Sequence, residues 1–154
     1  MFINITIMNK IHPPFLALAN ITIFYFSNFL ISSFEFFGQT VLAAIIGLEG
    51  FIIIILSIRL FEKGNTTVNP FKLDETSSLI TEGVYRFTRN PMYLGLSSIQ
   101  LGAAIYFGSY ISLILIPVFI VYITKKQIYF EEISLEKKFG KNFLKYSDRV
   151  RRWI

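Results

Sequence analysis

The chain has 154 residues, enough for one domain, and 53% of them are hydrophobic, a high fraction for a soluble protein. Its net charge is +5, it contains no cysteine, and it has one histidine, His12. This composition excludes a disulfide framework, a cysteine nucleophile and any site that needs two histidines, so we expect no metal centre. The apolar residues form blocks long enough to cross a bilayer, which takes about 20 residues per helix. The sequence therefore predicts an all-α integral membrane protein.

Four apolar blocks predict about four transmembrane helices in a single membrane domain, residues 1–154. The predicted spans lie near residues 13–34, 39–60, 91–107 and 110–124. A tight turn separates the last two spans, so we expect them to form an antiparallel helix hairpin at the core of the fold. Because no glycine interrupts residues 110–139, the fourth helix is expected to continue past the membrane surface into a C-terminal helical extension.

A few polar side chains lie inside these apolar blocks. Asn20 and Asn28 are eight residues apart and share a helix face, which we expect to point at other helices rather than lipid. Glu49 lies near the middle of the second span, where an ionisable side chain is costly and is a candidate for function. Alternatively, Glu49 is protonated or hydrogen-bonded to Asn20, Asn28 or Gln100. The second span also has small residues for close helix packing, within one chain or between two: Ala43, Gly47 and Gly50.

The basic residues are distributed unevenly. All 15 lysines and arginines lie on the side of the predicted bundle that holds both termini and the loop 61–90, and the two opposite turns hold none. This asymmetry predicts a multi-pass protein with the termini, the long loop and the C-terminal region 125–154 in the cytoplasm. If the chain is bacterial, the membrane is the inner membrane. The basic side then faces anionic lipid, so we expect membrane lipid rather than nucleic acid as its partner.

Two polar clusters meet on that side. Asn90 and Pro91 mark the start of the third helix, whose free N–H groups favour an anion, and Arg89 comes just before it. Glu131 and Glu132 lie on the extension of the fourth helix. Because the two helices are antiparallel neighbours, we expect the arginine and the carboxylates to come together as a site.

Each cluster has a plainer explanation. Glu131 and Glu132 would then pair with Lys125 and Lys126 on a solvated helix face. The arginines, among them Arg86, would lie beneath lipid headgroups, and the tyrosines would belong to an interfacial aromatic belt. If the clusters do form a site, its chemistry suits S-adenosylmethionine or a nicotinamide nucleotide, and the spacing does not separate the two. No glycine-rich phosphate loop is present, which excludes the soluble nucleotide-binding folds.

The second half of the chain carries a series of short motifs in order: Gly83-Val-Tyr85, Arg89-Asn-Pro91-Met-Tyr93, Glu131-Glu-Ile-Ser-Leu135, Phe139-Gly140 with Phe143 and Tyr146, and Val150-Arg-Arg152. This series resembles the small integral-membrane methyltransferases that include isoprenylcysteine carboxyl methyltransferase and the phospholipid methyltransferases. The resemblance covers residues 60–154, and residues 66–70 are similar to bacterial members. It implies a methyltransferase that uses S-adenosylmethionine and acts on a lipophilic or small acceptor, such as an isoprenylcysteine-like carboxylate, a lipid amine or a thiol.

The resemblance also implies which residues bind the cofactor: Gly83, Tyr85, Arg89, Asn90, Pro91, Tyr93, Glu131 and Glu132. Three of these are the expected catalytic residues: Arg89, Asn90 and Glu132. Asn90 departs from the family pattern, which usually has histidine there, and an amide cannot act as a base at neutral pH.

Charge matching suggests a role for each group. Arg89 and the helix start would hold the cofactor carboxylate, and Glu131 or Glu132 would hold its ribose hydroxyls or amino group. Tyr85 and Tyr93 would pack on the adenine or face the sulfonium, because an aromatic face attracts a cation.

Two other functions stay open. One is a membrane reductase that uses NADPH, related to the sterol reductases, which have a similar C-terminal arrangement but are usually longer. The other is a non-enzymatic protein whose basic face holds anionic lipid. The sequence leaves the methyl acceptor and the oligomeric state open.

Overall fold

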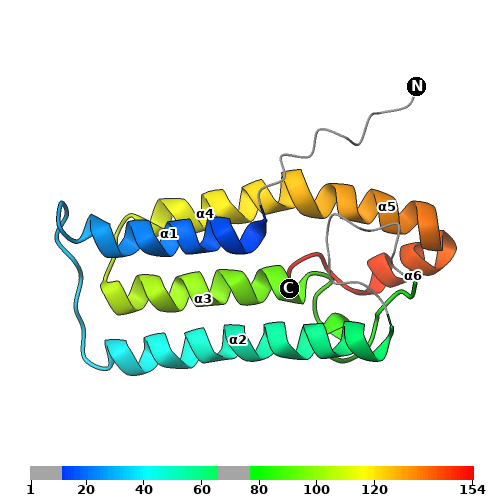
Figure 1. Cartoon of the computed structure of the whole chain (residues 1–154), viewed down its shortest axis with the longest axis horizontal. Coiled ribbons are helices and arrows are strands. Elements are labelled where there is room, and N and C mark those ends of the chain that lie inside the picture. The colour runs from blue at the N-terminus through cyan, green and yellow to red at the C-terminus, as the bar shows by residue number, and fades with distance from the viewer. Residues whose placement is uncertain (1–11, 66–76) are drawn as a thin grey trace.

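The computed structural model of the chain describes residues 12–65 and 77–154, and within those ranges no strand is present (Figure 1). The helical elements are α1 (Pro13–Ser27), α2 (Gln39–Lys63), a 3-10 turn η3 (Gly83–Arg86), α3 (Pro91–Phe107), α4 (Ser112–Ile123), a π-helical turn η4 (Thr124–Ile128), α5 (Tyr129–Phe139) and α6 (Lys141–Arg149). The predicted all-α fold is confirmed. Residues 66–70, part of the family resemblance, lie outside the described ranges.

α3 is the central helix of the bundle. It packs against α1, α2 and α4, and Figure 1 shows α2 running beside it along its whole length. Small residues make this close approach possible. A Cβ added to Gly50 would lie 2.6 Å from the carbonyl oxygen of Gly95, and one added to Gly102 would lie 2.8 Å from that of Ala43. The predicted small-residue face of the second span is therefore a contact within one chain.

The first helix is shorter than the sequence predicted. α1 ends at Ser27, although the first predicted span ran to residue 34. The Ser27 hydroxyl bonds to the carbonyl of Phe24 and to the hydroxyl of Ser109, 2.9 Å away. The Asn28 amide then donates to the carbonyl of Phe107 at 2.5 Å. These bonds tie the end of α1 to the end of α3, so the chain leaves the helix there.

The amides inside the bundle face other helices, as predicted, but Glu49 does not join them. The Asn20 amide donates to the Gln100 side-chain oxygen at 2.8 Å, which links α1 to α3. Glu49 lies on the exposed face of α2 and makes no hydrogen bond to any residue that the structure describes. The expected pairing of Glu49 with Asn20, Asn28 or Gln100 is therefore wrong, because each of those amides has another partner.

α4, η4 and α5 form one continuous helix, Ser112–Phe139, as the absence of glycine predicted. The π turn at Thr124–Ile128 adds a residue to the local helical turn and shifts the register of everything after it. This shift decides which faces of α5 point at the start of α3.

Two helices of the described residues are long and apolar enough to cross a membrane: α2 and the helix Ser112–Phe139. α1 and α3 have 15 and 17 residues and fall below that length. The outer face of α2 exposes large apolar side chains such as Leu48, Phe51 and Ile52, as a lipid-facing helix would. The structure therefore supports membrane association, while the number of spans stays a prediction.

Candidate functional site

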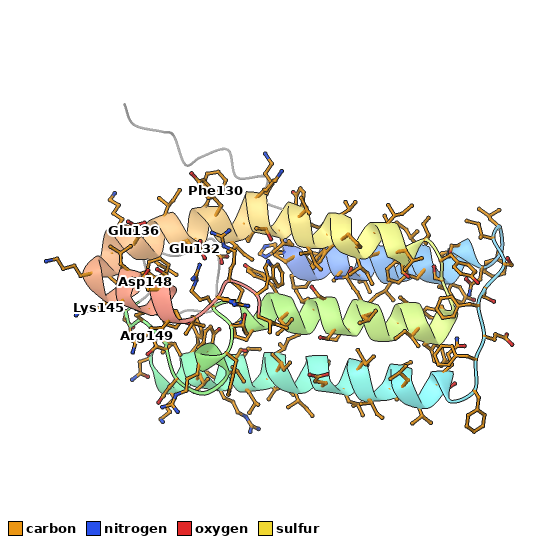
Figure 2. All side chains as sticks on the ribbon, turned by 180° about the vertical axis from the view of Figure 1, so that it is seen from behind. Phe130, Glu132, Glu136, Lys145, Asp148 and Arg149 are labelled. Atoms are coloured by element: carbon orange, nitrogen blue, oxygen red, sulfur yellow. The ribbon has the colours of Figure 1, made fainter. Side chains whose placement is uncertain are left out.

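Four elements meet at one end of the bundle. They are the η3 turn, the start of α3, the first half of α5, and the C-terminal segment that follows α6. Figure 2 shows Glu132 on α5 directed toward that last segment, on the same side as α6. The predicted meeting of the Arg89 and Glu131–Glu132 clusters is thus seen in the structure.

Glu132 lies between two arginines. Its Oε1 accepts hydrogen bonds from Arg89 Nη2 at 2.7 Å and Arg89 Nε at 3.2 Å. Arg152 approaches from the C-terminal segment, with Nε bonded to Oε1 at 3.1 Å and Nη2 to Oε2. The hydrogen bond to Glu132 raises the pKa of Arg152 above its usual value. Because both carboxylate oxygens of Glu132 are taken, this residue holds the C-terminal segment rather than offering a free binding group.

Arg89 also binds the C-terminal segment through the backbone. Its Nη1 donates to the carbonyls of Ser147 at 2.9 Å and Val150 at 2.7 Å, and its own N–H donates to the carbonyl of Arg151 at 3.0 Å. With its bonds to Glu132, four of the five N–H groups of this guanidinium are in use. In this conformation Arg89 therefore has one donor left for a ligand.

Asn90 occupies the N-cap position of α3, as predicted, but its side chain does not cap the helix. The amide donates instead to the carbonyl of Arg152 at 2.8 Å, and the Thr88 hydroxyl donates to the same oxygen. Pro91, buried at the first position of the helix, has no N–H to offer. The N–H groups of the following residues in the first turn therefore receive no side-chain cap, which leaves a partly positive helix end at the site.

Only one carboxylate oxygen of Glu131 accepts hydrogen bonds from the described residues. Its Oε1 accepts hydrogen bonds from the Tyr93 hydroxyl at 2.5 Å and the Gln127 amide at 2.7 Å. Its Oε2 accepts none from the residues that the structure describes. The two neighbouring glutamates thus differ: Glu132 is fully bound by arginine, and Glu131 presents one free carboxylate oxygen.

The η3 turn supplies the remaining predicted residues. Gly83 has φ +58°, and a Cβ there would lie 2.8 Å from the Leu60 side chain, so glycine suits both the backbone and the space. Tyr85 is buried against Phe61, and its carbonyl accepts a hydrogen bond from the Tyr146 hydroxyl at 2.8 Å. Burial raises the pKa of both Tyr85 and Tyr146, so both phenols stay neutral.

The plainer explanation of the glutamates does not hold. Their carboxylates bond to arginine, tyrosine and glutamine, whereas Lys125 and Lys126 are exposed. Arg86 is exposed as well and does not join the cluster. The sequence-based site set missed three participants: Arg152, which lay in the quoted Val150-Arg-Arg152 motif, Gln127, and Trp153, whose ring N–H donates to the Thr124 hydroxyl at 3.1 Å. No sequence pattern marked Gln127, because its position depends on the π turn.

Comparison with known proteins found a family and individual proteins to which the chain is similar. Residues 38–142 match the phospholipid methyltransferase family. An uncharacterized protein of Haemophilus influenzae is 38% identical over 63 residues, which cover 41% of this chain and all of that protein. Protein-S-isoprenylcysteine O-methyltransferase B of Arabidopsis thaliana is 32% identical over 85 residues, 55% of this chain and 43% of that protein. No solved structure matches the chain significantly.

Proposed function

The chain belongs to the phospholipid methyltransferase family, and from that premise we propose that it transfers a methyl group from S-adenosylmethionine to a lipophilic or small acceptor. The family and the apolar helices support a membrane methyltransferase. The observation that carries the proposed donor is the free Oε2 of Glu131 beside the uncapped start of α3.

These two groups fit the amino-acid part of S-adenosylmethionine. A carboxylate suits the N-terminal end of α3, where N–H groups lack side-chain caps, and an ammonium or hydroxyl donor suits the free oxygen of Glu131. Tyr93 fixes the Glu131 carboxylate through its other oxygen and adds an aromatic face near the same place. When bound, the cofactor supplies a methyl group on a positively charged sulfur.

Arg89 and Glu132 act in this proposal as positioning residues. With Arg152 they fix the C-terminal segment across the start of α3, and that segment in turn fixes Asn90. Their partly buried ion pairs keep the elements of the site in one arrangement, which is the main requirement for a transfer that depends on alignment. Gly83 and Tyr85, in the η3 turn, lie next to these residues and form one side of the proposed site.

The site favours an acceptor that needs no base. Asn90 cannot take a proton at neutral pH, Glu132 has both oxygens bound to arginine, and the free oxygen of Glu131 is assigned to the cofactor in this proposal. A carboxylate acceptor is already ionised, whereas a lipid ammonium must first lose a proton. We therefore propose an isoprenylcysteine-like carboxylate ahead of a lipid amine or a thiol, in keeping with the O-methyltransferase name of the Arabidopsis relative.

We also propose a multi-pass topology with four spans. Among the described residues, lysines and arginines lie at the site end of the bundle and none lies at the other end, which supports placing the termini and the loop 61–90 in the cytoplasm. The exposed apolar faces of α2 and α4 would then contact lipid, from which a lipophilic acceptor can reach the site sideways.

Calorimetric titration of the detergent-solubilised protein tests the donor. We expect S-adenosylhomocysteine to bind and NADPH not to bind, and we expect Glu131→Gln to weaken the binding about tenfold, because a charge-assisted hydrogen bond contributes about 1.5–3 kcal/mol. The matched control is Glu136→Gln on the exposed face of the same helix, which should bind like wild type. Binding of NADPH alone would indicate a reductase instead. Equal affinity in both variants would remove Glu131 from the cofactor site.

A further inference from the structure

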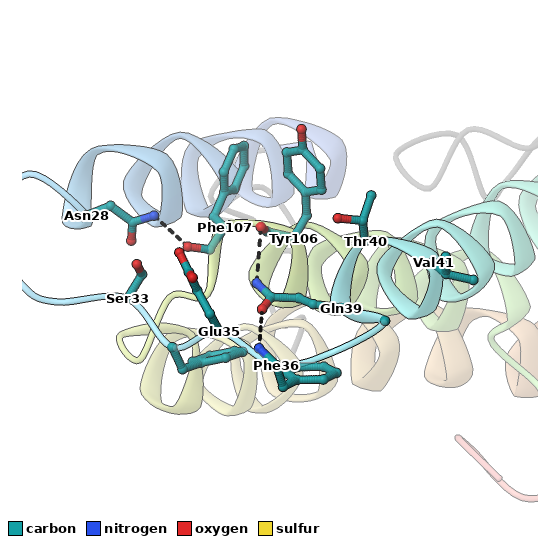
Figure 3. Close-up of a pocket in the computed structure, with 11 residues that line it drawn as sticks. Asn28, Ser33, Glu35, Phe36, Gln39, Thr40, Val41, Tyr106 and Phe107 are labelled. Carbon is teal, nitrogen blue, oxygen red and sulfur yellow. Dashed lines mark hydrogen bonds between the residues drawn. The ribbon is translucent and has the colours of Figure 1, made fainter.

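A cavity lies at the end of the bundle opposite the candidate site, under the connection between α1 and α2 (Figure 3). Its volume is about 580 Å³, and it is bordered by the ends of α1 and α3, the connection itself and the first turn of α2. None of the residues assigned to the methyltransferase site lines it. The cavity is large enough for a lipid headgroup, because small-molecule pockets measure about 300–1,000 Å³.

Most of the side-chain amide donors of this cavity are already used. The Asn28 amide donates to the carbonyl of Phe107, and the Gln39 amide donates to the carbonyl of Ile105 at 2.7 Å, as Figure 3 shows for Asn28. The other end of the Gln39 amide accepts from the N–H of Phe36 at 3.0 Å. These bonds satisfy the last carbonyls of α3 and leave the lining with few free donors.

Three side chains of the cavity have acceptor oxygens that are free: Glu35, Asn28 and Ser33. Glu35 points from the connection toward Asn28 and Phe107 (Figure 3), and no residue that the structure describes forms an ion pair with it. The side-chain oxygen of Asn28 and the hydroxyl of Ser33 also lack partners among the described residues. No lysine or arginine lines the cavity, so no cationic side chain of the described residues neutralises Glu35.

Aromatic rings complete the lining. Phe34 and Phe36 flank Glu35 with their rings stacked at 6.3 Å, and Tyr106 and Phe107 line the cavity from α3. A carboxylate beside aromatic faces attracts an organic cation, by charge and by the ring quadrupole. Because the free polar atoms are acceptors, the cation that fits is one with several N–H donors, such as a primary ammonium.

The surroundings point to a lipid rather than a soluble amine. At the same turn Phe29, Leu30 and Phe37 are 71%, 89% and 104% exposed, which is a strongly apolar surface around a charged cavity. Such a surface is stable where acyl chains cover it, and the adjoining outer face of α2 is apolar as well. The Thr40 hydroxyl at the start of α2 also lines the cavity and can donate to a headgroup phosphate.

We propose that this cavity binds the primary ammonium headgroup of an aminophospholipid in the membrane leaflet opposite the methyltransferase site. Glu35, Asn28 and Ser33 receive the three N–H donors, and the rings of Phe34 and Phe36 pack beside them. The site does not depend on the proposed methyl transfer, because it shares no residue with that site. It holds a lipid at the turn that joins α1 to α2.

Native mass spectrometry of the delipidated full-length protein tests the proposal, using phosphatidylethanolamine and phosphatidylcholine with the same acyl chains. We expect phosphatidylethanolamine to bind more tightly, because a quaternary ammonium has no N–H to donate. Glu35→Gln should weaken its binding about tenfold, since the lost interaction is charge-assisted. The matched control is Glu49→Gln, which removes an exposed carboxylate from α2, away from the cavity, and should leave the affinity unchanged.

Further binding measurements separate the alternative sites and ligands. Glu131→Gln should retain this lipid, and loss of the lipid in that variant would place it at the methyltransferase site instead. Free ethanolamine should bind far more weakly than the lipid, and equal binding would show that a soluble amine is the ligand. Equal affinity for the two phospholipids, or full binding by Glu35→Gln, would overturn the proposal. Because Glu35 is exposed, its substitution should not prevent folding.

Discussion

At the end of the bundle where α3 begins, Glu132 accepts hydrogen bonds from two arginines, whereas at the opposite end Glu35 has no cationic partner among the described residues. Glu131 is intermediate, with one oxygen bound and one free. The difference separates two uses of a carboxylate. A side chain whose oxygens are all taken stabilises the fold, and one with a free oxygen is available to a ligand.

The largest expected effect comes from breaking the ion pairs of Glu132 at the end of the bundle where α3 begins. Glu132→Ala leaves Arg89 and Arg152 close together without their shared anion, and the side chain of Arg89 is only 13% exposed. Removing one partner of a buried ion pair costs about 3–5 kcal/mol, so we expect a loss near the lower figure here, where Arg152 is partly exposed. Thermal unfolding in detergent would measure it, together with faster proteolysis of the C-terminal segment.

An exposed carboxylate of the same helix provides the control for that variant. Glu136→Ala removes a carboxylate from α5 without touching either arginine, so its melting temperature should stay within error of wild type. A Glu132→Ala protein as stable as this control would show that the arginine pairs do not hold the C-terminal segment.

A smaller effect is expected from the close packing of α2 on α3, which runs between the two ends of the bundle. In Gly50→Ala the new methyl group would meet the backbone of Gly95 at 2.6 Å, and α2 would have to move away from α3. Overpacking of this kind costs about 1–3 kcal/mol. Gly47→Ala is the matched control, because a Cβ at Gly47 has nothing within 4 Å. Equal unfolding free energies for these two variants would contradict the close packing of α2 on α3.

The smallest expected effect sharpens the role of the η3 turn. Tyr146→Phe removes the hydrogen bond to the carbonyl of Tyr85, at a cost of about 1 kcal/mol. Burial raises the pKa of Tyr146, so the unfolded chain loses this proton first as the pH rises. Its contribution is therefore complete below pH about 10 and falls as the pH rises further. A pH series of unfolding free energies should show a shallower alkaline loss in Tyr146→Phe than in wild type.

Local sequence signals predicted much of the helical framework. The bounds of α3 follow from Asn90-Pro91 at its start and Gly108 at its end, and the structure has them where the sequence placed them. Gly108 adopts φ +63°, which glycine tolerates at a helix C-terminus. α1 was the exception, because it ends through bonds to Ser109 and Phe107, more than 70 residues away in the chain.

The candidate site was only partly predictable. The ordered motifs identified both glutamates and Arg89. Arg152 reaches Glu132 only because the chain after α6 folds back across the start of α3. The position of Gln127 beside Glu131 depends in the same way on the π turn. Glu49 was misplaced because hydropathy shows that a residue is in an apolar helix without showing which face meets a neighbour.

By itself the sequence determined the apolar blocks, the gathering of basic residues toward one side and the motifs of a methyltransferase family, because each of these is a property of residue type and order. Only the tertiary structure decided which carboxylates are bound and which are free. Neighbouring residues on a helix point about 100° apart, so Glu131 and Glu132 face different partners, and those partners come from distant segments whose paths no local pattern specifies.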